Sequence, residues 1–143
     1  MSLIEKIVRL RRWRLAREVL LFYGVELPAE VEIGRDFNLV HRGVGTVVHP
    51  STTIGDRVRI YHQVTIGRLD AHLPASESDM ERIVIEDDVV LFPGAKVLGG
   101  AGITYVRRGT ILGANAVLTR STGRNEIWAG VPAKMISIRT DLE

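Results

Sequence analysis

The chain has no cysteine, no long apolar run and little net charge, and each absence removes a class of function. Without cysteine it can form no disulfide, no thiolate metal site and no cysteine acyl-enzyme. No apolar stretch approaches the roughly 20 residues of a membrane span, and residues 2–17 are too charged for a signal peptide. The net charge of +2 does not indicate a nucleic-acid-binding protein. We therefore expect a soluble, cytoplasmic protein without a nucleic-acid partner.

What the chain does have is four groups of residues, aliphatic except for one tyrosine, that recur at six-residue steps. Members of the series are Ile33 and Leu39, then Ile54, Ile60 and Ile66, then Ile85, Leu91 and Val97, and finally Tyr105, Ile111 and Val117. A period of six is typical of hexapeptide solenoids, in which three short faces close one coil and the repeated residue points into the core. One coil cannot bury that face alone, so coils must stack. The 143 residues suffice for one such domain.

The repeat divides the chain into segments. Residues 1–23 predict a helical segment, residues 24–136 the solenoid, and residues 137–143 a short tail. Residues 43–53 are longer than one hexapeptide, which predicts that one corner between Leu39 and Ile54 bulges. Residues 69–82 are polar, of mixed charge and contain a proline, and they predict a loop that projects from the coils.

The helical segment has two possible roles. Aliphatic residues recur in it at three- and four-residue steps opposite arginines, which predicts an amphipathic helix, or two, that stops at Gly24. The apolar residues are Ile4, Ile7, Val8, Leu10, Leu15, Val19 and Leu20. The helix could cover an open edge of the solenoid or pack on a partner subunit. Alternatively, its basic face could contact anionic lipid as a peripheral membrane anchor, with Trp13 and Phe22 at the interface.

The solenoid resembles the hexapeptide-repeat acyltransferases of the left-handed β-helix class. It is most similar to the serine acetyltransferase branch, which includes small O-acetyltransferases of exopolysaccharide synthesis. The resemblance covers residues 21–136 through FYGVELPAEVEIGRDFNLVH, IGDRVRIYHQVTIG, ILGANAVL and the closing GVPAK. It implies an all-β, left-handed parallel β-helix, a homotrimer with active sites between subunits, and acetyl-CoA as acyl donor.

His41 stands where this family has its catalytic histidine. An imidazole can take the proton from an acceptor hydroxyl as the hydroxyl attacks the thioester carbonyl. Because the chain has no cysteine, direct transfer is the simpler mechanism. The family orients this histidine with an acid fifteen residues earlier, which here is Glu26, and a carboxylate would fix the tautomer and stabilise the imidazolium. A surface histidine and a solvated acid are the alternatives.

The acceptor residues depart from those of serine acetyltransferase. That enzyme has an aspartate before the catalytic histidine and an Arg-His pair before the repeat resumes, whereas this chain has Val40 and the pair Glu81 and Arg82. Val40 cannot bind an ammonium group, and Glu81 would repel a carboxylate. A sugar or saccharide hydroxyl is therefore the expected acceptor rather than serine. His62, His72 and Arg82 are the candidate acceptor-binding residues, although the two histidines could equally be surface residues.

The resemblance also indicates where coenzyme A would bind. The residues that it assigns are Gly67, Arg68, Phe92, Pro93, Gly113, Ala114 and Lys134. Small residues would let the pantetheine arm approach the backbone, although turn geometry alone explains each of them. Lys134 would lie near the nucleotide phosphates. A γ-carbonic anhydrase zinc site needs two histidines five residues apart, and the chain has no such pair, so we expect no metal.

Together these features predict an acetyl-CoA-dependent O-acetyltransferase that acts on a sugar or saccharide. A serine O-acetyltransferase is one alternative. A non-catalytic solenoid scaffold is another, and it would be favoured by loss of His41 and Glu26, both of which the chain retains.

Overall fold

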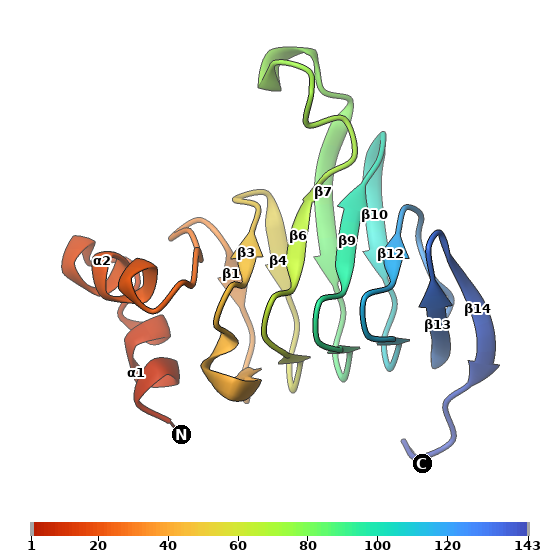
Figure 1. The fold of residues 1–143 in the computed structure, drawn as a ribbon, viewed down its shortest axis with the longest axis horizontal. Coiled ribbons are helices and arrows are strands. Elements are labelled where there is room, and N and C mark those ends of the chain that lie inside the picture. Colours follow the sequence, from red (N-terminus) through yellow and green to blue (C-terminus); the bar gives the residue numbers. More distant parts are fainter. Residues whose placement is uncertain (1, 143) are drawn as a thin grey trace.

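The computed structural model describes residues 2–142 and forms a stack of coils with two helices at its N-terminal end (Figure 1). Three sheets make the faces of the coil. The β1 sheet joins β1 (Glu32–Ile33), β4 (Thr52–Ile54), β7 (Met80–Ile85) and β10 (Gly102–Val106). The β3 sheet joins β3 (Val47–Val48), β6 (Thr65–Arg68), β9 (Lys96–Gly99) and β12 (Val117–Leu118). The coil predicted from the sequence is therefore confirmed.

The β2 sheet forms the third face and is the longest. It joins β2 (Asn38–Leu39), β5 (Arg59–Ile60), β8 (Val90–Leu91), β11 (Ile111–Leu112), β13 (Glu126–Gly130) and β14 (Ala133–Ile138). Its strands pair in parallel except β13 and β14, which form an antiparallel hairpin at the C-terminal end of the stack. Because each strand is in register with the strand one coil later, equivalent side chains form ladders along the stack.

The inward ladders make one continuous aliphatic core. On the β2 sheet, Ile60, Leu91 and Leu112 are in register and 0% exposed. The ladder ends at Trp128, which pairs with Leu112 and is 5% exposed. The period of six therefore marks inward residues in these coils, as predicted.

In the last coil the prediction is wrong by one residue. The buried positions are Val106, Leu112 and Leu118. Each directly follows a residue that the period had indicated, and those residues, Tyr105, Ile111 and Val117, are only half-buried. Because Ile111-Leu112 and Val117-Leu118 are apolar at both positions, hydrophobicity cannot tell which residue faces inward. Pairing with the preceding coil decides the orientation, since Leu112 is in register with the buried Leu91.

The two helices cover the open end of the first coil. They are α1 (Leu3–Arg9) and α2 (Arg14–Phe22). Ile4, Val8 and Leu20 are buried and belong to the same apolar cluster as the solenoid core. The N-terminal segment therefore packs on the solenoid end, which was the first of its two expected roles.

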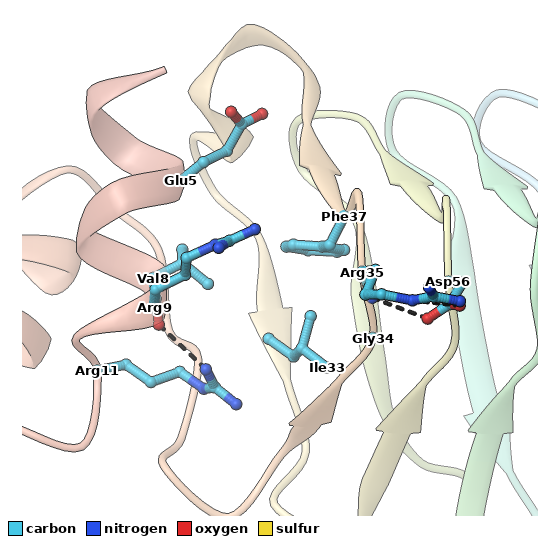
Figure 2. A pocket seen from close by; sticks show the side chains of 9 residues that line it. All are labelled: Glu5, Val8, Arg9, Arg11, Ile33, Gly34, Arg35, Phe37 and Asp56. Carbon is cyan, nitrogen blue, oxygen red and sulfur yellow. Dashed lines mark hydrogen bonds and ion pairs between the residues drawn. The ribbon is translucent and has the colours of Figure 1, made fainter. Parts of the chain in front are cut away.

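A pocket of about 350 Å³ lies between α1 and the first coil (Figure 2). Apolar side chains, among them Val8 and Phe37, line it together with arginines. Arg11 at its edge donates to the carbonyl oxygens of Val8 (3.1 Å) and Val31, and so ties the helical segment to the solenoid. No residue predicted for catalysis or cofactor binding lines this pocket.

The two predicted irregularities are present, with shifted bounds. The corner after β2 contains the short 3-10 helix η1 (Val40–Gly43), so nine residues separate Leu39 from Val48 where six separate Ile60 from Ile66. The bulge thus lies between Leu39 and Ile54, as predicted, although it begins before residue 43. The projecting loop contains η2 (Ala75–Glu77) and ends at residue 79 rather than 82, because β7 begins at Met80 and pairs with β10 (Figure 1).

The predicted tail from residue 137 is part of the fold. Ser137 and Ile138 belong to β14. Arg139 is 7% exposed and donates from its guanidinium to the carbonyl oxygen of Asp88 (2.9 Å) and the carboxylate of Asp141 (2.7 Å). Sequence patterns did not indicate this contact because Arg139 and Asp88 lie 51 residues apart.

Candidate active site

His41 lies on the enlarged corner between the β2 and β3 sheets. His41 (φ 53°), Arg42 (φ 62°) and Gly43 (φ 64°) form a run of three left-handed residues. A left-handed conformation is strained for residues other than glycine, and such strain is concentrated at functional sites. The His41 side chain is exposed and accessible to a ligand.

Two rings from the next coil lie beside His41, and a third ring, from the coil after that, lies beside one of them. Its ring centroid is 5.4 Å from that of His62 and 6.0 Å from that of Tyr61. The Tyr61 ring is in turn 5.5 Å from Phe92. Strand register explains the cluster: Val40, Tyr61 and Phe92 each follow one of the paired residues of β2, β5 and β8, so they occupy equivalent outward positions. The structure therefore brings together three predicted residues, His41, His62 and Phe92.

Tyr61 was missed in the sequence analysis. The sequence does contain a signal for it, because Tyr61 directly follows the inward Ile60 just as Phe92 follows the inward Leu91. Two aromatic residues at the same outward repeat position indicate a ring-lined surface rather than a solvated turn.

His62 has an unsatisfied polar atom beside His41. Its Nδ1 is buried and has no hydrogen-bond partner within residues 2–142. Leaving a buried polar atom unpaired costs about 1–3 kcal/mol. Because no surface of this atom is exposed in one chain, a ligand or another subunit could pair with it only after the imidazole had turned.

Glu26 lies on the segment beside the His41 corner, but it does not contact the imidazole. Its N–H donates to the carbonyl oxygen of Thr46 (2.9 Å), and its own carbonyl accepts from Val48 (2.9 Å). Both residues belong to the stretch through which the chain leaves the corner. The Glu26 side chain is exposed, and in the described part of the chain no hydrogen bond joins it to His41. The predicted dyad therefore stays a prediction.

Most of the predicted cofactor residues form a strip along the same corner. Gly113 and Ala129 continue the outward ladder after Phe92, and Lys134 pairs with Ala129 in the terminal hairpin. Pro93 and Ala114 follow Phe92 and Gly113 at the turn. The strip thus consists of Phe92, Pro93, Gly113, Ala114 and Lys134, and it runs from the ring cluster to the C-terminal end of the stack.

Gly67 and Arg68 lie apart from this strip. They are at the C-terminal end of β6, where the chain leaves the β3 sheet for the loop. The Arg68 guanidinium donates to the carbonyl oxygen of Leu73 (3.0 Å) and lies 3.5 Å from the Asp70 carboxylate. Within one chain, Arg68 holds the base of the loop. Binding of a cofactor phosphate by this side chain would compete with that contact.

The remaining polar candidates do not meet at His41 within one chain. His72 is exposed on the projecting loop. Arg82 donates to the Thr53 hydroxyl (2.7 Å) on the β1 sheet. The structure thus leaves both residues outside the ring cluster.

His49 has a structural contact at the corner where β3 leads into β4. Its Nδ1 accepts a hydrogen bond from the Ser51 N–H (3.1 Å). Burial, followed by the nearby Arg68 charge, lowers the pKa of His49. Among residues 2–142 there is no group of three or more side chains that could hold a metal ion. No helix in the same range is both long and apolar enough to cross a membrane.

The three-faced parallel coil with a histidine on an open corner defines a hexapeptide-repeat β-helix protein. The chain is 39% identical over 124 residues to a plasmid-encoded serine acetyltransferase of Synechococcus elongatus, which covers 82% of this chain and 35% of that protein. The structure of serine acetyltransferase from Vibrio cholerae matches 96% of this chain and 54% of its own, with a TM-score of 0.76 and 25% identity. No protein-family model matches the chain.

A Brucella abortus serine acetyltransferase solved in complex with coenzyme A has the same fold, with a TM-score of 0.79 at 23% identity, covering 94% of this chain and 55% of its own. This chain accordingly belongs to the serine acetyltransferase branch of the hexapeptide-repeat acyltransferases, which have a left-handed β-helix. It spans about a third to a half of the length of these relatives. The predicted likeness to exopolysaccharide O-acetyltransferases is not supported by them.

Proposed function

We propose that the protein is an acetyl-CoA-dependent O-acetyltransferase in which His41 is the general base. This proposal rests on the arrangement of residues along the corner that carries His41. An exposed histidine on strained backbone stands at one end of a strip of small residues, and a free cation, Lys134, stands at the other. The relatives named serine acetyltransferase support the same chemistry.

The proposed reaction is a direct transfer. The His41 imidazole removes the acceptor hydroxyl proton while that oxygen attacks the thioester carbonyl carbon. The carbon–sulfur bond then breaks, and the imidazolium returns the proton to the leaving thiolate. Glu26 would orient the imidazole and stabilise its charged form once substrates bind. A positioned general base of this kind contributes about 10²–10⁴-fold to the rate.

The strip from Phe92 to Lys134 is the proposed path for coenzyme A. Gly113 and Ala114 keep the corner free of bulky side chains, so an extended pantetheine arm could reach the backbone. Lys134 is exposed and supplies a mobile cation for the nucleotide phosphates. The coenzyme A complex of the Brucella relative supports this donor.

Serine is the first candidate acceptor because the curated relatives are serine acetyltransferases. This favours the alternative over the saccharide that we expected from the sequence. A carboxylate-bearing acceptor would require a cation that Glu81 does not supply. Arg82 is exposed beside it and could do so if its bond to Thr53 were released.

A sugar hydroxyl is the second candidate, and the ring cluster favours it. Tyr61 and Phe92 present flat apolar surface beside His41, and Phe92 is 37% exposed. Val40, half-buried next to His41, offers no charge to an ammonium group. A sugar ring would match this surface better than a small zwitterion would.

We further propose a homotrimer in which a neighbouring chain completes each site. Within one chain, His72 lies on the projecting loop and Arg68 holds the base of that loop, so neither joins the ring cluster. Both positions are accounted for if these residues serve sites shared between subunits. Analytical ultracentrifugation would test this assembly, and a monomer at assay concentration would contradict it.

Release of free thiol from acetyl-CoA tests the function. The assay would use the full chain with serine and with a panel of sugars, and Tyr61→Ala would accompany the wild type. If the acceptor is a sugar, Tyr61→Ala should raise the acceptor KM severalfold and leave the acetyl-CoA KM unchanged. Turnover with serine alone, unaffected by Tyr61→Ala, would establish serine and exclude the ring-stacking role. No thiol release with any acceptor would contradict the acetyltransferase.

A further inference from the structure

The N-terminal helical segment carries charge that the solenoid lacks. Residues 1–23 contain six lysines and arginines but only two glutamates, a net of +4, while the whole chain is only +2. The remaining residues therefore sum to −2. A local excess of this size is an electrostatic signal for an anionic partner.

The same segment exposes large apolar side chains where α1 turns into α2. Leu10, Trp13 and Leu15 are 55%, 73% and 75% exposed. Phe22, at the end of α2, is 87% exposed, and it shares a helix face with Leu15 because seven residues make about two turns. Leu10 and Leu15 had been expected on the packed side. The helices thus have one apolar face on the core and a second one facing outward.

Cations alternate with these apolar residues and are available for binding. Arg12 and Arg14 flank Trp13, both are exposed, and neither side chain forms a hydrogen bond or salt bridge within residues 2–142. Arg11 is different, because its guanidinium donates to the carbonyl of Val8 (Figure 2) and also to that of Val31. Arg11 therefore holds the segment on the solenoid, while Arg12 and Arg14 face outward.

We infer that the patch formed by Leu10, Arg12, Trp13, Arg14, Leu15 and Phe22 docks on an anionic lipid surface. An exposed Trp13 between two arginines, together with an exposed Phe22, suits the boundary between head groups and acyl chains. A second copy of this chain fits less well, since a symmetric contact would place one strongly positive segment against another. α2 has only nine residues, so the contact would lie in the interface and would not cross the membrane.

Vesicle flotation tests this inference without reference to acetyl transfer. The full chain would be mixed with phosphatidylcholine vesicles, with and without phosphatidylglycerol, at low and high salt. We expect flotation only with the anionic vesicles and its loss at high salt. Arg12→Gln/Arg14→Gln should lower the partition coefficient roughly 30-fold, because each cation near an anionic surface contributes about a fivefold factor.

The matched control removes two exposed cations from the solenoid. Arg59 and Arg124 are exposed and make no side-chain bond within the described residues, so Arg59→Gln/Arg124→Gln should float as the wild type does. Fluorescence gives a second readout: the chain has two tryptophans, and Trp128 is only 5% exposed. A blue shift on vesicle binding therefore reports burial of Trp13, and Trp13→Ala should abolish it.

Three results would overturn the inference. One is no flotation with anionic vesicles at low salt. Another is an equal loss of binding in both double-arginine variants, which would indicate a general charge effect. The third is a combination of two results: the wild type does not bind vesicles, and Trp13→Ala/Phe22→Ala has a lower solution mass than the wild type. That combination would show that a second copy of the chain covers the patch. Circular dichroism would verify that each variant remains folded.

Discussion

In each coil, one corner precedes the strand of the β2 sheet and another corner follows it. These two corners are built on the same repeat but have opposite chemistry. The corner before the sheet, which we term the charge corner, stacks Arg35, Asp56, Arg57, Asp88 and Arg108. Arg35 donates to Asp56 (2.7 Å), Arg57 donates to Asp88 (2.7 Å), and Arg108 donates to Asp88 (3.2 Å). Every charged group in that list has an opposite charge in a neighbouring coil.

The corner after the sheet, which we term the histidine corner, stacks Val40, His41, Tyr61, His62 and Phe92. None of these side chains donates or accepts a hydrogen bond within residues 2–142, and the Nδ1 of His62 is buried without a partner. Left-handed residues occur at both corners, for instance Arg57 and Asp88 at the charge corner. Only the histidine corner has three in succession.

The difference shows how a repeat separates stability from function. At the charge corner each acid is satisfied by an adjacent coil, and the hydrogen bonds from Arg57 hold the pKa of Asp88 below its usual range. At the histidine corner the polar side chains have no hydrogen-bond partner within residues 2–142, and the exposed His41 is accessible to substrates. Substitutions at the histidine corner should lower activity and leave the free energy of unfolding nearly unchanged. Substitutions at the charge corner should lower the free energy of unfolding and leave activity unchanged.

The largest expected effect is on catalysis. His41→Ala should lower kcat about 10²–10⁴-fold, because it removes the general base. Its unfolding free energy should remain near that of the wild type, since the side chain is exposed. Thiol release under saturating acetyl-CoA measures the first quantity and urea unfolding the second. A fully active His41→Ala enzyme would contradict the assignment of this corner as the active site.

A smaller effect is expected from Glu26. Glu26→Gln should reduce kcat on the order of 10-fold, because an amide cannot stabilise the imidazolium as a carboxylate does. Glu30 provides the matched control, since it is a neighbouring exposed acid with no predicted role. Glu30→Gln should retain full activity. Equal kinetics for the two variants would make Glu26 an ordinary surface acid.

The smallest effect is on stability, at the charge corner. Asp88→Asn should cost about 1–2 kcal/mol in unfolding free energy at neutral pH, because two arginines lose an ionised acceptor. Asparagine tolerates the left-handed backbone of Asp88 (φ 59°), so strain should not contribute. Activity should be unchanged. Asp79→Asn on the loop is the control, and an equal cost there would contradict a specific ladder contribution.

Comparing Asp88→Asn with the wild type at different pH values gives a second test. The folded-state pKa of Asp88 is lowered, so its stabilising effect is present above the unfolded pKa of about 3.9 and is lost as pH falls toward the folded value. Wild type and Asp88→Asn should therefore differ most near neutral pH and converge below about pH 4. A constant difference across that range would show that the Asp88 charge is not responsible.

Particular residues show how much of the candidate site could be predicted from the sequence. His41 and its neighbours at positions 62 and 92 were predicted, and the structure places all three in one cluster. Tyr61 was missed, and Arg68 was assigned to a cofactor although its head group holds the base of the loop. The contact of Arg68 with the loop is one that no local pattern contains, and its assignment to the cofactor stays a prediction.

The sequence alone determined the repeating coil, because the period of six sets which residues a short strand can bury. It also determined where the repeat is interrupted and which histidine stands at the first corner. Only the tertiary structure decided that Leu112 rather than Ile111 faces the core, that Arg139 anchors the chain end, and that Leu15 and Phe22 face outward. These choices depend on pairing between residues a coil or more apart, so packing selects among alternatives that hydrophobicity leaves equal.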